Sequence, residues 1–290
     1  MTRRSRSVRA YLDLVKFEHT LFALPFAYSG MLLAAGGWPG WATFGWITLA
    51  MVGARTAAMA LNRLIDARID ARNPRTANRE LPAGVLGRGD ALLLVLLGFG
   101  AFSLAGWALN PLTLALLPVA VLALTLYPYT KRFTFLCHLW LGVSIGAAAA
   151  GGWIAVTGSF QPAALLLWAV VALWIAGFDI VYGILDLGFD RQHGVHSIPA
   201  AFGEQAAVNI SGAMHLVSWL LLLALPLLLP LGLPYLLSTL AVGGVLLYAH
   251  LLVRRLGAAA ALQSFNANLY VSAIVLLGVI LDLAARSQAG

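Results

Sequence analysis

The chain has 290 residues, of which 61% are hydrophobic and 10% charged, with a formal net charge of +7 and one cysteine. This composition excludes a soluble globular domain, and the single cysteine, Cys137, excludes an internal disulfide. The positive charge lies between apolar stretches, so it indicates membrane topology and gives no reason to expect a nucleic-acid partner.

Long apolar stretches recur along the chain, and most are long enough to cross a bilayer as a helix. We therefore predict an all-α, polytopic membrane protein with nine transmembrane helices in one bundle. No stretch is polar enough for a separate soluble domain, so we expect one transmembrane domain over residues 1–290. In chain order, the predicted helices cover about residues 20–36, 41–61, 91–109, 111–128, 136–156, 162–185, 206–229, 234–253 and 269–284.

The distribution of Lys and Arg predicts the orientation of these helices. Basic residues occur before the first helix, between the second and third, and after the fourth, sixth and eighth, whereas the loops on the opposite side have none. Because basic loops face the cytoplasm, we expect residues 1–16 and the polar loops at about 62–90 and 186–205 to be cytoplasmic. The first apolar stretch lacks a convincing cleavage site and is predicted to be retained. The expected location is the cell (inner) membrane.

Acidic residues are rare and concentrated in two places. The chain has 11 Asp and Glu residues, and five of them are aspartates in two stretches at the inner ends of predicted helices. Carboxylates beside lipid are costly, and in membrane proteins they usually have a function. The five are Asp66, Asp70, Asp179, Asp186 and Asp190.

The first acidic stretch, NRLIDARID, ends the second predicted helix. On a helix that advances about 100° per residue, Arg55, Asn62, Asp66 and Asp70 fall on one polar stripe. Such stripes face the interior of a bundle or a water-filled cavity.

The second acidic stretch, DIVYGILDLGFD, ends the sixth predicted helix. A continuous helix would place Asp179, Tyr182, Asp186 and Asp190 on a similar stripe. If the two stripes face one another, they line a central cavity that opens near the cytoplasmic side.

So many carboxylates around one cavity would repel one another unless cations lie between them. Mg²⁺ is the expected cation, because it takes oxygen ligands and completes its shell with substrate phosphates and water. Three nearby basic side chains, those of Arg75, Arg79 and Lys131, are candidates for binding phosphate oxygens. Metal ions and basic groups around an apolar cavity indicate a site for an amphiphilic diphosphate.

Each of these residues also has a structural interpretation. The carboxylates could pair with nearby arginines, Asp179 could make a structural hydrogen bond, and the basic residues could serve topology alone. The histidines His138, His193 and His196 are expected to be structural rather than catalytic. The arginines available for such pairs are Arg63, Arg68, Arg72 and Arg191.

Three motifs, in this order along the chain, resemble the UbiA superfamily of intramembrane prenyltransferases over nearly the whole length. They are an Asn-x-x-x-Asp-x-x-x-Asp motif, a Tyr-x-x-x-Lys element after the fourth helix, and a second Asp-rich motif. The matching residues are Asn62, Asp66 and Asp70; Tyr127 and Lys131; and Asp179, Asp186 and Asp190.

Within the superfamily, the segments FDIVYGILDLGFDR and HSIPAAFG look most like the 4-hydroxybenzoate polyprenyltransferase group. That group includes relatives assigned to the futalosine route of menaquinone synthesis, which prenylate a hydroxynaphthoate. The segment KRFTFLCHLWLG is similar too, but His138 stands where many 4-hydroxybenzoate enzymes have Gln. Both acceptors therefore stay open.

The resemblance implies nine helices around a central cavity and an Mg²⁺-dependent polyprenyltransferase. The implied metal ligands are Asn62, Asp66 and Asp70 for one ion and Asp186 and Asp190 for a second. The five aspartates are the implied catalytic residues, with Asp179 beside the second site or near the acceptor. The implied diphosphate-binding residues are Arg75, Arg79, Lys131 and Tyr127, and the implied acceptor-binding residues are Arg55 and Tyr182.

We therefore expect transfer of a polyprenyl group from polyprenyl diphosphate to a hydroxylated aromatic acid of the 4-hydroxybenzoate type, in respiratory quinone biosynthesis. The same chemistry on a hydroxynaphthoate is the alternative. A secondary transporter is the alternative from another class, because transporters also hold aspartates inside helical bundles. Transporters typically break helices near the midplane, however, and these motifs lie near the cytoplasmic ends. The expected partners are the two substrates and the lipid bilayer, with no nucleic acid.

Overall fold

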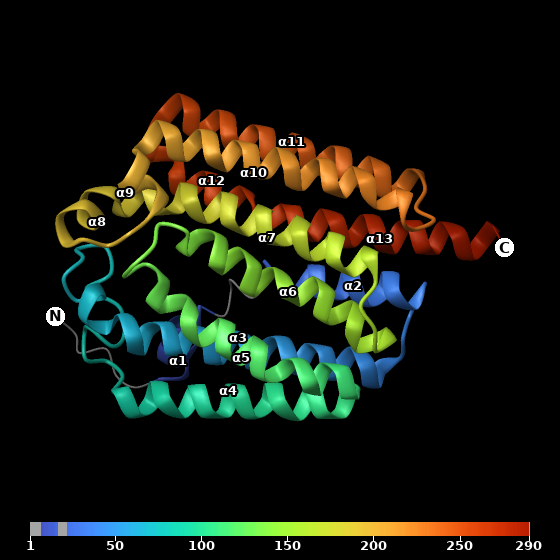
Figure 1. Ribbon diagram of the computed structural model, residues 1–290, viewed down its shortest axis with the longest axis horizontal. Coiled ribbons are helices and arrows are strands. Elements are labelled where there is room, and N and C mark those ends of the chain that lie inside the picture. The colour runs from blue at the N-terminus through green and yellow to red at the C-terminus, as the bar shows by residue number, and fades with distance from the viewer. Residues whose placement is uncertain (1–6, 17–21, 290) are drawn as a thin grey trace. The chain divides into compact units, whose positions relative to one another are not determined.

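The computed structural model describes residues 7–16 and 22–289, and these residues contain helices and no strand. The chain divides into two compact units (Figure 1). Unit 1 comprises Met1–Thr20 and Gly45–Tyr129, and unit 2 comprises Leu21–Phe44 and Thr130–Gly290. Helix α3 passes from unit 2 into unit 1, and helix α5 ends at the boundary between the units.

The described residues of unit 1 form four α-helices: α1 (Val8–Val15), α3 (Trp41–Asp70), α4 (Arg88–Leu109) and α5 (Pro111–Thr130). Unit 2 is built from the remaining helices, several of which are short. They are α2 (Leu24–Ala35), α6 (Cys137–Thr157), α7 (Pro162–Gly183), α8 (Leu187–His193), α9 (Ile198–Phe202), α10 (Glu204–Ala224), α11 (Leu233–Leu256), α12 (Ala261–Ala267) and α13 (Leu269–Ala289).

Each of the nine stretches predicted to cross the membrane contains a helix, namely α2, α3, α4, α5, α6, α7, α10, α11 and α13. By length and hydropathy, seven segments of the described chain qualify as membrane spans. The last of them, Leu233–Gln288, contains both α11 and α13, and α2 has only 12 residues. Residues 20 and 21 of the first predicted stretch lie outside the described part of the chain. The all-helical, multi-pass prediction is confirmed, whereas the count of nine spans and the central cavity stay predictions.

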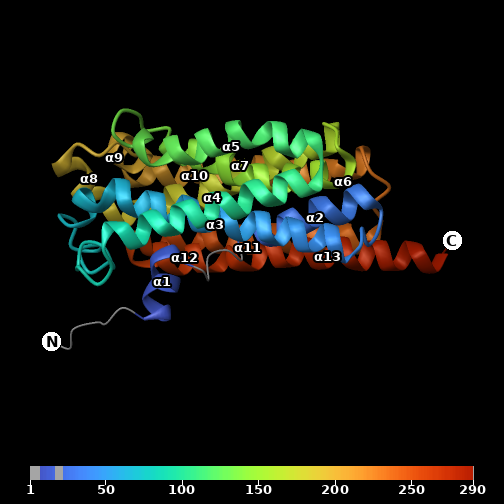
Figure 2. The same cartoon turned by 90° about the horizontal axis from the view of Figure 1, so that it is seen from below.

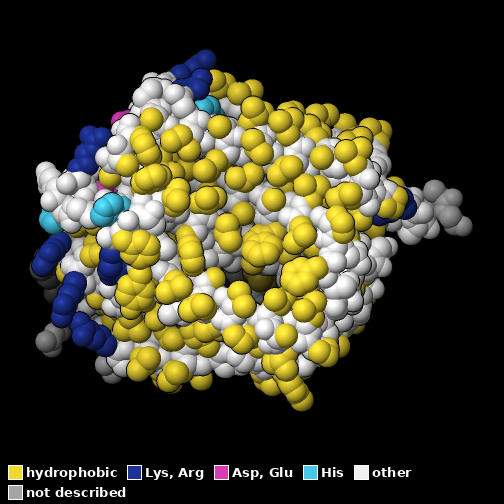
Figure 3. Space-filling model, in the orientation of Figure 1, with side chains coloured by type: hydrophobic (Ala, Val, Ile, Leu, Met, Phe, Trp, Pro, Cys, Tyr) yellow, Lys and Arg dark blue, Asp and Glu magenta, His cyan; other side chains and the backbone are white. Residues whose placement is uncertain are grey.

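The side chains on the surface of both units agree with a membrane location. Figure 3 shows hydrophobic side chains along the helices, with Lys and Arg near helix ends. Large apolar residues are exposed on several long helices, including Leu96 on α4, Val119 on α5 and Leu247 on α11. In water such surface would be unfavourable, but lipid tails solvate it without cost.

In unit 1, α1 packs on α3 and α4 through a buried apolar cluster that includes Leu14, Ala60 and Val95. Helices α3 and α4 approach closely at Gly53 and Gly98, where an added Cβ would lie 2.7 Å from a backbone oxygen of the facing glycine. Small residues permit this approach because no side chain separates the two backbones.

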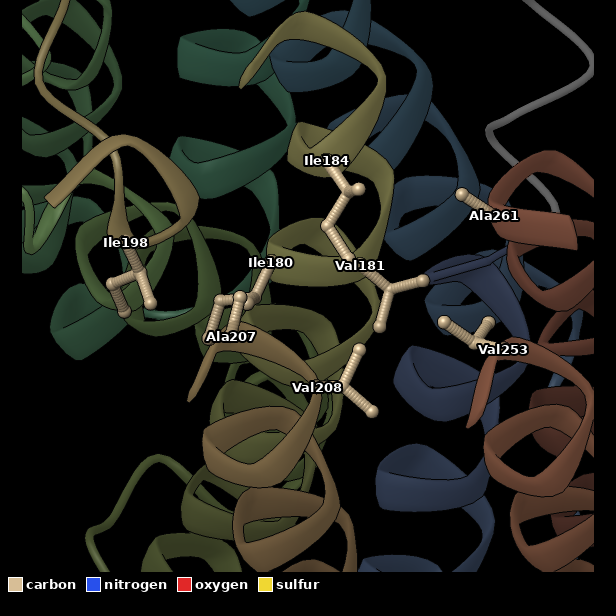
Figure 4. Packing of buried hydrophobic residues seen from close by; sticks show 8 residues of the cluster. All are labelled: Ile180, Val181, Ile184, Ile198, Ala207, Val208, Val253 and Ala261. Atoms are coloured by element: carbon tan, nitrogen blue, oxygen red, sulfur yellow. The ribbon is translucent and has the colours of Figure 1, made fainter. Parts of the chain in front are cut away.

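In unit 2, α7 is the central helix, and α6, α10 and α12 pack against it. Figure 4 shows part of this core, where Ile180 of α7 lies beside Ala207 of α10, and Val181 points toward Val208 of α10 and Val253 of α11. On the outer side, α11 lies beside α13, as Figure 2 shows. This packing holds the C-terminal end of α7, where the second acidic motif begins.

Glycines set the spacing between α6 and its neighbours. A Cβ on Gly142 would collide with the carbonyl oxygen of Ala172 in α7, and a Cβ on Gly152 would collide with that of Ala27 in α2. Gly151, the preceding residue, faces open space. The helix backbones are therefore in direct contact at Gly152 but not at Gly151.

This difference generates a stability prediction. Gly152→Val should destabilise the protein by about 1–3 kcal/mol, because the added side chain has no room against α2. Gly151→Val, with the same change in helix propensity, is the matched control and should be close to wild type. Unfolding in detergent, followed by circular dichroism, measures both. Equal stability of the two variants would contradict the close α2–α6 contact.

Candidate active site

The first acidic motif lies on a continuous helix, as predicted. Helix α3 runs without a break to Asp70, so Asn62, Asp66 and Asp70 are at positions i, i+4 and i+8 of one face. The side-chain amide of Asn62 donates a hydrogen bond to Asp66 Oδ2 at 3.1 Å. Asp66 is 1% exposed and Asp70 is 4% exposed. Two buried carboxylates and a half-buried amide thus lie on one face of α3.

Two arginines compensate the charge of Asp70. Arg79 Nη1 donates to both carboxylate oxygens, at 2.8 and 2.9 Å. Arg63 Nη1 lies 3.9 Å from Asp70 Oδ2, and its Nε donates to the carbonyl oxygen of Leu14 in α1 at 3.4 Å. The structure therefore joins a predicted metal ligand to a predicted phosphate-binding residue. For Asp70, the pairing with Arg63 that the sequence left open is present as well.

The loop after α3 folds back on the end of the helix. Thr76 Oγ1 donates to the carbonyl oxygen of Asp70 at 3.0 Å, and Asn73 Oδ1 accepts a hydrogen bond from the backbone N–H of Arg75, also at 3.0 Å. These bonds satisfy backbone groups that the helix end leaves unpaired. They place Arg79 at the carboxylate, whereas Arg75 lies in an exposed part of the same loop.

The predicted acceptor-binding residue Arg55 lies earlier on α3, about two turns before Asn62. Its Nε is buried and has no hydrogen-bond partner among the described residues. Tyr127 of α5, predicted to bind diphosphate, is close enough to Arg55 for an electrostatic interaction. A buried guanidinium with an unpaired N–H is suited to binding an anionic group.

The second acidic motif differs from the prediction of one continuous α-helical stripe. Helix α7 ends at Gly183, residues Ile184–Asp186 form a 3₁₀ turn, and α8 begins at Leu187. A 3₁₀ turn has 3.0 residues per turn instead of 3.6, so the spacing that aligns residues on an α-helix does not hold across it. The stripe prediction is therefore wrong for the passage from Asp179 to Asp190.

Asp190 is held by a hydroxyl group. It is 7% exposed, and Ser197 Oγ donates to its Oδ2 at 2.8 Å. The same Ser197 Oγ accepts from the N–H of Ala200 at 3.2 Å, which caps α9. The backbone N–H of His196 donates to the carbonyl oxygen of Lys131 at 2.8 Å, and the charge of Lys131 interacts with Asp190. The structure thus brings predicted residues Lys131 and Asp190 into one neighbourhood of unit 2.

Asp179 has a partner that the sequence did not indicate. His138 Nδ1 lies 2.7 Å from Asp179 Oδ2. Tyr182, one turn further on, packs its ring against Phe265 of α12 with a centroid distance of 4.7 Å. The structural hydrogen bond considered for Asp179 is therefore present, and its partner is an ionisable group.

The donor atoms of both motifs fit Mg²⁺. Within the described residues, no group of three or more His, Cys, Asp or Glu side chains is arranged to hold a metal ion alone. Each motif offers oxygen ligands, and Mg²⁺ usually takes one or two carboxylates and completes its shell with phosphates and water. The residue types suit a metal that arrives with a phosphate substrate better than a closed structural site.

Comparison with known protein families identifies the family of this chain. Residues 23–274 match the UbiA prenyltransferase family. The chain belongs to this family. It is thus a UbiA-type prenyltransferase, and the transporter alternative is set aside.

Curated UbiA relatives cover almost the whole chain. The 4-hydroxybenzoate octaprenyltransferase of Vibrio vulnificus (strain CMCP6) is 30% identical over 275 residues, which are 93% of this chain and 96% of that protein. The protein of the same name from Vibrio cholerae serotype O1 is 31% identical over 279 residues, or 95% and 98% of the two chains.

Solved structures share the UbiA fold. The apo structure of a UbiA homolog from Aeropyrum pernix K1 is 38% identical, with a TM-score of 0.84 over 91% of this chain and 98% of that chain. A UbiA homolog from Archaeoglobus fulgidus, bound to GPP and Mg²⁺, has the same fold at 17% identity, with a TM-score of 0.74 over 95% and 99% of the two chains.

Sequence reasoning did not single out Ser197, and it assigned His138 a structural role. Both act on motif carboxylates, but His138 is 41 residues from Asp179 in the sequence, and periodicity cannot pair residues so far apart. For Ser197 a local signal existed, since a Ser before Ile-Pro is typical of a helix N-cap.

Ser197 provides a prediction for this part of the UbiA chain. Ser197→Ala should lower the unfolding free energy by about 2 kcal/mol, because it removes the cap of α9 and a hydrogen bond to a carboxylate. Ser197→Thr keeps the hydroxyl and serves as the control. Unfolding of both variants in detergent tests this, and an Ala variant as stable as the Thr variant would contradict it.

Proposed function

We propose that this UbiA-family protein transfers a polyprenyl group from polyprenyl diphosphate to a hydroxylated aromatic acid of the 4-hydroxybenzoate type, in respiratory quinone biosynthesis. The observation that carries the proposal is the polar face of α3, which bears Asn62, Asp66 and Asp70. At the end of this face, the guanidinium of Arg79 donates two hydrogen bonds to Asp70. The names of the two Vibrio relatives support the acceptor.

The proposed diphosphate site uses the basic residues with the two acidic motifs. Asn62, Asp66 and Asp70 would hold one Mg²⁺, and Asp186 and Asp190 a second. When bound, Mg²⁺ would supply Lewis-acid stabilisation of the negative charge that develops on the diphosphate. The Archaeoglobus fulgidus homolog with GPP and Mg²⁺ supports this choice of cofactor.

The chain's own residues would then bind and orient the diphosphate. Arg79 is already held by Asp70, and Lys131 interacts with Asp190, so each unit has a cation beside a motif carboxylate. Arg75 and Tyr127 complete the proposed set. Cations held in place before reaction stabilise the leaving diphosphate without reorganisation as the allylic carbon–oxygen bond breaks.

The acceptor would be bound through its carboxylate. Arg55 has a buried, unpaired Nε, and Tyr182 offers an aromatic face at the second motif. The ring carbon ortho to the acceptor's hydroxyl attacks the allylic carbon of the prenyl group. Loss of the proton from that ring carbon then restores aromaticity. We further propose that residues 1–290 act as one domain in the cell inner membrane, with the N-terminus cytoplasmic.

The first experiment measures product formation by the purified protein in detergent. The reaction contains Mg²⁺, a long-chain prenyl diphosphate, and either 4-hydroxybenzoate or 6-hydroxynaphthoate. Prenylated 4-hydroxybenzoate, detected by mass spectrometry, is expected. Asp66→Asn and Asp186→Asn should each lower the rate at least about 100-fold, because loss of a positioned electrostatic group typically costs that much.

Asp13→Asn is the matched control, because Asp13 is a partly exposed aspartate of α1 that lies near Arg9 and belongs to neither motif. It should retain wild-type activity. Product from the naphthoate alone would reassign the acceptor to the menaquinone route. Absence of product and of pyrophosphate release with both acceptors, from folded protein, would overturn the proposed function.

A second prediction concerns Arg55. Arg55→Gln should raise the KM for 4-hydroxybenzoate about tenfold or more, because a charge-assisted hydrogen bond to the carboxylate is lost. The KM for the prenyl diphosphate should not change. With 4-hydroxybenzamide as a neutral acceptor, the variant and wild type should differ little.

Arg68→Gln is the control for Arg55, since Arg68 is an exposed arginine on the same helix. Steady-state kinetics with each acceptor give the comparison. If Arg55→Gln impaired both acceptors to the same extent, Arg55 would not be the carboxylate-binding residue.

A further inference from the structure

The pair formed by His138 and Asp179 is the most informative contact that the proposed chemistry does not yet use. Nδ1 of His138, in the first turn of α6, lies 2.7 Å from Oδ2 of Asp179 in α7. The side chain of His138 is 7% exposed, whereas that of Asp179 is 23% exposed. The imidazole is thus on the buried side of the pair, and the carboxylate is on the accessible side.

Packing defines the position of the imidazole. A Cβ on Gly183 would lie 3.1 Å from His138 Cε1 and 3.5 Å from its Nε2. The same Cβ would be 3.5 Å from Cγ of Pro199. A side chain at position 183 would press against the ring, so glycine leaves the imidazole its room here. Gly183 therefore belongs to the structural support of His138.

The hydrogen bonding of the ring is one-sided. Nε2 of His138 is buried and has no hydrogen-bond partner among the described residues, whereas Nδ1 makes a short hydrogen bond with Asp179. A buried ring nitrogen without a partner is costly, and a histidine used only for packing could be replaced by an apolar residue without that cost. The contact with Asp179 is therefore the feature that explains a histidine at this position.

The carboxylate of Asp179 is also hydrogen-bonded through only one of its two oxygens among the described residues. Oδ2 of Asp179 is bound by His138, and Oδ1 has no hydrogen-bond donor among the described residues. Asp179 lies in α7, seven positions before the motif residue Asp186, which belongs to the 3₁₀ turn that follows this helix. An oriented carboxylate with one open oxygen can accept a hydrogen bond from a hydroxyl group of a ligand.

We propose that His138 is a positioning residue that holds one oxygen of Asp179, so that the other oxygen accepts a hydrogen bond from the phenolic hydroxyl of the aromatic acceptor. This inference rests on the proposed function and names the group that binds the hydroxyl end of the acceptor.

The arrangement has a chemical consequence. A phenol that donates a hydrogen bond to a carboxylate releases more electron density into its ring, and the ring carbon ortho to the hydroxyl becomes a better nucleophile. Holding the hydroxyl also selects which ring carbon faces the allylic carbon, and such orientation is a large part of catalysis. The role of His138 is exerted through Asp179 and not by contact with the substrate.

The test compares His138→Leu with His138→Asn. Leu has no donor, whereas the side-chain amide of Asn places an N–H close to the position of imidazole Nδ1. For the Leu variant, kcat/KM for 4-hydroxybenzoate should fall at least about tenfold, the typical loss for a hydrogen bond to a charged group. The KM for prenyl diphosphate and the Mg²⁺ concentration that gives half the maximal rate should stay at wild-type values. Asn should recover most of the acceptor kcat/KM.

A double-mutant cycle separates positioning from general damage. Asp179→Asn should lower kcat/KM for the acceptor at least as much as His138→Leu does. Adding His138→Leu to Asp179→Asn should then cost nothing further, because the histidine acts only through this carboxylate. Additive losses would overturn the proposal.

Gly183→Ala keeps the inference testable if His138→Leu does not fold. The added methyl group is too close to Cε1 and should shift the ring, with the same selective loss for the acceptor. Gly151→Ala is the matched control, since Gly151 is an exposed glycine of α6 with open space around it. Circular dichroism and unfolding in detergent confirm folding of each variant.

The outcomes distinguish this inference from the proposed function. If wild type makes prenylated product and His138→Leu has wild-type acceptor kinetics, the positioning role is wrong and the proposed function stands. A rise in the KM for prenyl diphosphate as large as the acceptor effect would also overturn the positioning role. If wild type prenylates no aromatic acid, the proposed function itself has failed.

Discussion

Buried carboxylates in apolar helices are stable only where cations or hydrogen-bond donors compensate them, and both acidic motifs meet this requirement. In unit 1 the compensation is ionic. Asp70 receives Arg79 and Arg63, and loss of one partner from a buried pair costs about 3–5 kcal/mol. Because Arg63 also donates to Leu14, the same group of charges ties α1 to α3. The ion pair therefore shapes the unit as well as the proposed site.

In unit 2 the compensation comes from polar side chains brought in by packing. Gly142 lets α6 approach the backbone of α7, and this approach puts His138 within hydrogen-bond distance of Asp179. Ser197 serves Asp190 in the same way while it caps α9. Two carboxylates of one motif thus acquire different neighbours, and we have assigned them different roles, one at the acceptor and one at the metal.

The two motifs also show where helical periodicity in the sequence predicts the structure correctly and where it fails. For NRLIDARID the 3.6-residue period holds, because α3 continues through Asp70. Thr76, in the loop that follows, hydrogen-bonds to the carbonyl oxygen of Asp70 at the helix end. For the second motif the period fails, because residues Ile184–Asp186 tighten into a 3₁₀ turn after Gly183. A sequence pattern assumes one regular helix, and it does not register a turn that tertiary packing imposes.

The sequence by itself determined that the chain is all-helical and crosses the membrane many times, which residues carry the acidic motifs, and which family they resemble. These features depend on hydrophobicity and on spacings of three, four or seven residues, which are local properties. Only the tertiary structure decided that Arg79 pairs with Asp70, that Ser197 holds Asp190, and that His138 holds Asp179. Such contacts depend on how closely helix backbones approach and how loops fold back, and spacing along the chain does not encode either distance.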